Sequence, residues 1–142
     1  MTVLLPAVAL AAILLLLSLV HWYWALGGQR GLAAAVPTSA SGEPLVSPGR
    51  LAAAGVAFAL LVAAGLALWP ACPYAVGPPW VQRGGVWGIA LVFTARAVGD
   101  GRYVGFSKRV RDTAFGRRDS RLYSPLCALI AFLAIWVARF HP

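Results

Sequence analysis

Long apolar stretches separated by shorter polar ones dominate this chain of 142 residues. The stretches cover residues 3–26, 51–69, 80–99 and 125–140. About 18 to 20 consecutive apolar residues are enough to cross the hydrocarbon core of a bilayer as a helix. Ser18 is the only polar side chain between Val3 and Val20, so the first stretch has no stripe that could face water. The pattern predicts an all-α integral membrane bundle of four transmembrane helices that forms a single domain over residues 1–142.

The third stretch is the least apolar of the four. Residues 86–98 alone are too short to span about 30 Å of hydrocarbon, so the helix must extend back to Pro79 and Trp80 and include Arg83. The fourth stretch has a clear start, because Ser124 can cap a helix and Pro125 suits its first position. The connection over residues 27–50, called the first loop below, is rich in Gly, Pro and Ser, with a possible short helix at Leu32–Val36.

Composition agrees with a membrane protein, since 61% of the residues are hydrophobic and only 11% are charged. Soluble domains carry about 25% charged residues. The net charge of +8 comes largely from seven Lys and Arg residues between Arg102 and Arg121, called the basic segment below. These charges lie between two predicted membrane helices, and no nucleic-acid-binding motif accompanies them. The expected partners are therefore the bilayer and its anionic head groups, and not nucleic acid.

The distribution of positive charge predicts the orientation in the membrane. With four helices, the loops over residues 27–50 and 100–124 lie on the same side. Ten Lys and Arg residues lie there or at the adjoining helix ends, whereas the other side has only Arg83 and Arg139. By the positive-inside rule both loops face the cytoplasm and both termini lie outside, as in a multi-pass protein of the bacterial inner membrane.

Polar and aromatic side chains that could form a site gather on this predicted cytoplasmic side. His21 ends the first stretch among tryptophans, which indicates either an aromatic belt or a ligand site. Arg96 and Asp100 are one helical turn apart and are expected to pair, either for structure or to present Arg96 to an anion. The candidate ligand-binding residues are His21, Trp22, Trp24, Arg96, Asp100, Arg102, Lys108, Arg109, Arg111, Asp119 and Tyr123.

Apolar residues recur at helical spacing within the basic segment and just beside it. Tyr103, Phe106, Val110 and Ala114 would form one face of a short amphipathic helix lying on the membrane surface between the third and fourth spans. Positive charge alone would serve to fix the topology. Acidic residues among the bases, Asp112 and Asp119, favour specific ion pairs that shape the loop.

At these residues the chain resembles a small family of bacterial membrane proteins known as domain of unknown function 3995. The resemblance rests on the run from His21 to Gly28 with Ala35-Val36-Pro37, and on the run Arg96 to Phe106 continuing through Lys108–Thr113 to Asp119 and Tyr123-Ser124-Pro125-Leu126. It covers nearly the whole chain and implies a four-helix membrane protein. It implies no catalytic residues or cofactor, because the family has no established activity.

Three functions are compatible with these observations. The favoured one is binding, with a possible role in transport, of an anionic or amphipathic small molecule or lipid head group in a cytoplasm-facing pocket. A membrane enzyme using His21 as a general base beside Asp100 or Asp119 is an alternative, although no nucleophile stands at a fixed spacing from His21, and a metal centre is not indicated. The other alternative is an accessory subunit that meets its partner through the small residues Gly55, Ala59, Ala63 and Ala67. A homodimer is compatible with these observations, since four short helices enclose little volume.

Overall fold

The computed structural model describes residues 3–69 and 77–140, and this part of the chain is helical, without any extended strand. Its elements are α1 (Leu4–Ala25), α2 (Leu32–Ala35), α3 (Arg50–Leu68), α4 (Pro79–Val98), α5 (Ala114–Arg118), the π-helical turn η2 (Asp119–Tyr123) and α6 (Ser124–Phe140). The last three follow one another without a break. The four predicted long helices and the short helix in the first loop are therefore confirmed as helices.

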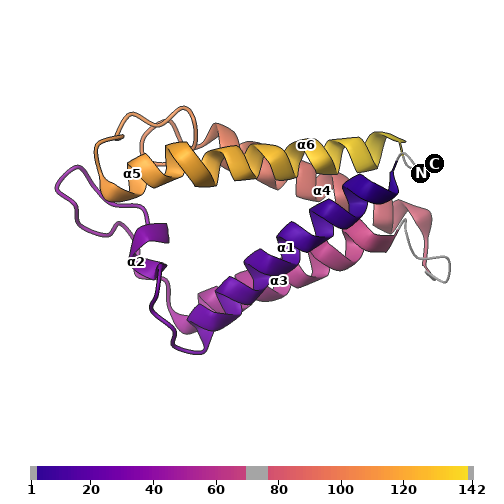
Figure 1. The fold of residues 1–142 in the computed structure, drawn as a ribbon, viewed down its shortest axis with the longest axis horizontal. Coiled ribbons are helices and arrows are strands. Elements are labelled where there is room, and N and C mark those ends of the chain that lie inside the picture. Colours follow the sequence, from indigo (N-terminus) through magenta and orange to yellow (C-terminus); the bar gives the residue numbers. More distant parts are fainter. Residues whose placement is uncertain (1–2, 70–76, 141–142) are drawn as a thin grey trace.

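The long helices form two pairs, α1 with α3 and α4 with α6 (Figure 1). The pairs contact each other where α1 begins and α6 ends, and they diverge toward the other end of the molecule. The first loop and the basic segment both lie at that diverging end, which we call the loop end. Helix α2 lies between the two helix pairs at the loop end and contacts α5 (Figure 1).

Small side chains bring α1 and α3 close together. Ala7 and Ala11 of α1 and Ala57 of α3 are buried, and the Ser18 hydroxyl donates a 2.7 Å hydrogen bond to the carbonyl of Ala57. Bonding to that carbonyl satisfies the only polar side chain between Val3 and Val20. Gly55 and Ala59 are exposed, whereas Ala67 is buried and Ala63 packs against the core, so only the second half of the small-residue ladder predicted on α3 packs inside this molecule.

The outer surfaces of the helices carry many exposed large apolar side chains, including Leu16, Leu19 and Phe58. Among the described residues, three helices are long and apolar enough to cross a membrane: α1, α3 and the continuous helix Ala114–Phe140. The predicted third span forms the 20-residue helix α4, but its polar residues Gln82 and Arg83 and its glycines make it less apolar than the others. Length and composition therefore support a helical membrane protein, and they do not confirm α4 as a fourth span.

The predicted amphipathic helix between the third and fourth spans is wrong, because residues 99–113 form an irregular loop. Gly99, Gly101 and Gly105 have φ angles of +88°, +75° and +83°, which lie outside the right-handed helical region. The loop folds back on the end of α4, where the backbone amides of Phe106 and Ser107 donate to the carbonyls of Ala97 and Val98. These bonds satisfy carbonyls that the end of a helix would otherwise leave free. Helix structure resumes only at Ala114, where the Thr113 hydroxyl caps α5.

Candidate functional site

A buried ion cluster joins α4, the folded-back loop and the start of the α6 helix. Asp119, on the π-helical turn, is 0% exposed and accepts from Arg96 Nη2 at 2.8 Å and from Lys108 Nζ at 2.8 Å. The Ser124 hydroxyl, at 2.8 Å, and the Gly105 amide, at 3.0 Å, also donate to this carboxylate. We call these residues the Asp119 cluster. With four donors around a buried carboxylate, the charge is well satisfied, and three segments of the chain are tied to one point.

Lys108 is as deeply buried as its partner, with 2% of its surface exposed. Its ammonium group also donates to the Gly105 carbonyl at 2.8 Å. Two cations thus share one carboxylate, and the cluster carries an excess of one positive charge. Arg96 Nη1 is buried and has no acceptor among the described residues. The cluster therefore explains two predicted site residues, Lys108 and Asp119, as internal structure, and leaves one donor of Arg96 unused.

The predicted pair between Arg96 and Asp100 is wrong. The backbone leaves the helix at Gly99, with positive φ, and Asp100 instead accepts hydrogen bonds from three backbone amides of its own loop. These are the amides of Arg102, Tyr103 and Val104, at 2.7–2.9 Å from Asp100 Oδ1. Desolvation acts to raise the pKa of Asp100, but these hydrogen bonds outweigh it and leave the pKa below its usual value. The role of Asp100 is to hold the loop.

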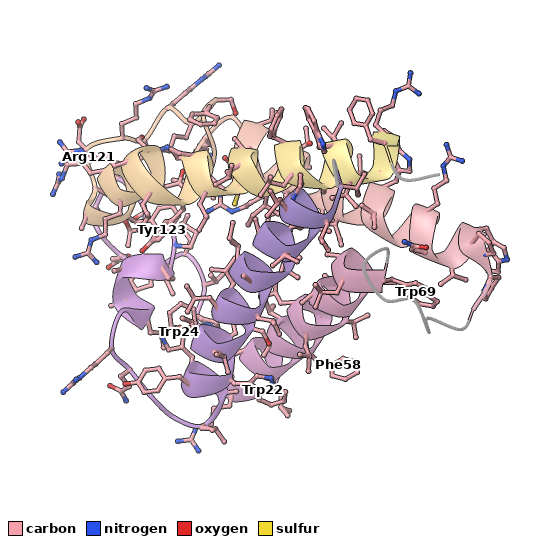
Figure 2. All side chains as sticks on the ribbon, turned by 45° about the vertical axis from the view of Figure 1, so that its right-hand side comes forward. Trp22, Trp24, Phe58, Trp69, Arg121 and Tyr123 are labelled. Atoms are coloured by element: carbon pink, nitrogen blue, oxygen red, sulfur yellow. The ribbon has the colours of Figure 1, made fainter. Side chains whose placement is uncertain are left out.

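Hydrogen bonds from two aromatic side chains hold the first loop between the helix pairs. Trp24 Nε1, from the end of α1, donates to the carbonyl of Arg30 at 3.0 Å. The hydroxyl of Tyr123, from the π-helical turn, donates to the carbonyl of Ala34 at 3.2 Å. Figure 2 shows Trp24 and Tyr123 on either side of the short helix α2. Both residues belong to the predicted site, and both position the first loop.

The hydrogen bond and the ring contact of His21 involve residues outside the Asp119 cluster. Its Nδ1 is 2.8 Å from the carbonyl of Leu17, one turn earlier, and its ring contacts that of Trp24 edge to face with centroids 4.9 Å apart. The Trp22 side chain is exposed. Within residues 3–69 and 77–140, no hydrogen bond or ion pair links either residue to Arg96 or Asp119. The structure thus joins Arg96, Lys108 and Asp119 directly and leaves the aromatic end of α1 as a separate group.

The remaining arginines of the basic segment form an exposed cationic surface at the loop end. Its members are Arg102, Arg109, Arg111, Arg117, Arg118 and Arg121. Arg102 lies over the ring of Tyr103, 5.1 Å from its centroid, and Arg111 and Arg117 donate to backbone carbonyls. In the described part of the chain, ion pairs form only within the Asp119 cluster. The charge of these six side chains is therefore not neutralised by neighbouring acids. Arg121 marks this surface in Figure 2.

A cleft of about 550 Å³ separates the first loop from the basic segment. Its walls are Thr38, Ala40, Ser41 and Gly42 on one side and Val110, Arg111, Asp112, Thr113 and Ala114 on the other. Of these residues, only Arg111 belongs to the ligand site predicted from the sequence. Nothing in the local sequence marks the wall from Thr38 to Gly42, because the cleft exists only where two loops distant in the chain approach each other.

The fold and its polar end define a class of protein: a helical chain whose described residues include three helices suited to crossing a membrane, with a cationic loop end. The model of the family described as "Protein of unknown function (DUF3995)" matches residues 14–134. The chain belongs to this family, as its sequence motifs predicted. No curated protein and no solved structure matches it.

Proposed function

We propose that this chain is a multi-pass protein of the bacterial inner membrane that binds an anionic or amphipathic small molecule, or a lipid head group, at its loop end. The observation that carries the proposal is the set of six exposed arginines without acidic partners. The proposed orientation takes α4 as a fourth span, so that both termini lie outside and the loop end faces the cytoplasm. An arginine-rich surface there lies at the depth of the lipid phosphates.

The distribution of the acids strengthens this proposal. The chain has four acidic residues. Asp119 forms ion pairs with the cations of its own cluster, and Asp100 accepts hydrogen bonds from backbone amides. Neither can neutralise the exposed arginines. Each Lys or Arg near an anionic membrane surface contributes on the order of 1 kcal/mol to attraction. The loop end is thus strongly attractive to anions.

The rigidity of the loop end favours a defined site over a loose cationic tail. The Asp119 cluster ties the basic segment to α4 and α6, and the loop covers the end of α4 with backbone hydrogen bonds. Guanidinium groups held by such a scaffold lose less conformational entropy on binding than mobile ones. A purely topological signal needs no such scaffold.

The test is native mass spectrometry of the protein released from nanodiscs that contain phosphatidylglycerol. We expect wild type to retain this lipid, and the triple variant Arg109→Ala, Arg118→Ala, Arg121→Ala to retain it at least about tenfold less. The matched control is Arg83→Ala with Arg139→Ala, which removes exposed arginines from helices outside the basic segment. Equal loss in both variants, or no loss in the triple variant, would contradict the proposal.

A further inference from the structure

The cleft between the first loop and the basic segment has chemistry that the exposed arginines lack. We propose that it binds a zwitterionic group, an anionic phosphate or carboxylate that carries a primary ammonium a few bonds away. Its volume of about 550 Å³ falls in the range typical of small-molecule sites, about 300–1,000 Å³. This inference rests on the proposed function, because it names the ligand class of the same loop end.

Arg111 supplies the anion-binding side of the cleft. Its Nε donates to the Lys108 carbonyl at 3.0 Å and its Nη2 donates to the Phe106 carbonyl at 3.0 Å. These bonds hold one edge of the guanidinium against the loop. A guanidinium has five N–H donors, so those on the other edge stay available in a fixed plane. A planar pair of donors is suited to two oxygens of a phosphate or carboxylate.

Asp112 supplies the ammonium-binding side. It follows Arg111 directly, its side chain is exposed, and it forms no ion pair within the described residues. Its backbone carbonyl, in contrast, is engaged by Arg117 Nη1 at 2.5 Å, which fixes the main chain beneath it. Asp112 therefore lines the cleft, and no cation of the described residues forms an ion pair with its carboxylate.

Hydroxyl groups supply further polar contacts in the walls. The buried hydroxyl of Thr38 has no hydrogen-bond partner in the described part of the chain. A buried hydroxyl without a partner is costly, and a bound polar ligand would satisfy it. The hydroxyl of Thr113 accepts from the Gly116 amide, which leaves its own proton free to be donated.

The combination of charges selects against simple anions. A ligand with only negative charge would be attracted by Arg111 and repelled by the adjacent Asp112, whereas a zwitterion meets both side chains with opposite charge. Simple anions therefore bind the other five exposed arginines, and the cleft with Arg111 takes ligands with an ammonium group. An ethanolamine phosphate, free or as a lipid head group, has this chemistry.

The experiment compares two head groups that differ in the ammonium. Binding to the full-length protein in detergent is measured for phosphatidylethanolamine and phosphatidylglycerol, and separately for soluble glycerophosphoethanolamine and glycerophosphoglycerol. Asp112→Asn should weaken ethanolamine binding about tenfold and leave glycerol binding unchanged or tighter. Thr38→Val should also weaken binding of the ethanolamine ligands. The matched control Glu43→Gln removes an exposed acid of the first loop that does not line the cleft, and should change neither.

The outcomes separate this inference from the proposed function. An ethanolamine preference seen with the soluble compounds supports a free zwitterion as ligand, and one seen only with intact lipids supports a head group. Retention of phosphatidylglycerol without any ethanolamine preference, or an equal effect of Asp112→Asn on both head groups, overturns the cleft site while the proposed function stands. If wild type retains none of the four ligands, both are wrong.

Discussion

The substitution Asp119→Asn tests whether the buried ion cluster holds the loop end together. It keeps the size of the side chain but removes the negative charge that Arg96 and Lys108 share. Lys108, with 2% of its surface exposed, would then be a buried ammonium without a counter-charge. An amide group can also replace only part of the carboxylate's accepting capacity toward the Gly105 amide and the Ser124 hydroxyl.

Removing one partner of a buried ion pair typically costs about 3–5 kcal/mol. The Arg96 side chain is 33% exposed and can turn toward water, so most of the cost comes from Lys108. We therefore expect a loss near the lower limit, about 3 kcal/mol. The free energy of unfolding is measured by titrating the protein from mild detergent into dodecyl sulfate, with helical circular dichroism as the signal.

The matched control is Asp112→Asn, which removes an exposed carboxylate that pairs with no cation in the described chain. Its effect should stay within about 0.5 kcal/mol. A second variant, Lys108→Met added to Asp119→Asn, removes the stranded ammonium and should recover part of the loss. If Asp119→Asn costs no more than Asp112→Asn, or the added Lys108→Met recovers nothing, the reasoning about the cluster is refuted.

Three further predictions concern the folded-back loop and the helix contact. Gly105→Ala should destabilise the protein more than Gly101→Ala in the same unfolding titration. Both residues have positive φ, which costs an alanine about 1–2 kcal/mol. Of the two, only Gly105 would also bring a Cβ into collision with the backbone of Gly99. Ala57→Leu should cost about 1–3 kcal/mol by overpacking the contact between α1 and α3, whereas Ala59→Leu on the exposed face should be nearly neutral. The lowered pKa of Asp100 means that its stabilising effect is complete above the unfolded pKa of about 3.9 and is lost as pH falls through the lower folded value. Unfolding titrations from pH 5 to pH 3 should therefore show a smaller loss of stability for Asp100→Asn than for wild type, and equal slopes would contradict the prediction.

The helices could be predicted from the sequence because their signals are local. The apolar stretches have nearly the same bounds as α1, α3, α4 and α6. The predicted helix start at Ser124 is wrong, because α5, η2 and α6 form one continuous helix and the Ser124 hydroxyl donates to Asp119 instead of capping an end. A run of apolar residues long enough to cross a bilayer needs no information from the rest of the chain. The family relation was also visible in the motifs, and its model match confirms it.

Two predictions from local sequence patterns were wrong because the residues make contacts with distant parts of the chain. The helical spacing from Tyr103 to Ala114 predicted a surface helix, but glycines with positive φ and the carbonyls at the end of α4 give this segment a different set of hydrogen bonds. Arg96 and Asp100, one turn apart, were expected to pair. Arg96 pairs instead with an acid 23 residues further along. In both cases the backbone turns at Gly99 and carries the chain to new partners.

The sequence by itself thus determined the helical segments, the apolar surface and the concentration of positive charge between two helices, since each is a property of neighbouring residues. Only the tertiary structure decided which charges are buried and which remain exposed. Asp119 and Lys108 look like any other charges of the basic segment, and Thr38 like any residue of a polar loop. Their roles arise where segments distant in the chain meet, because burial and pairing depend on distances in space that spacing along the chain does not contain.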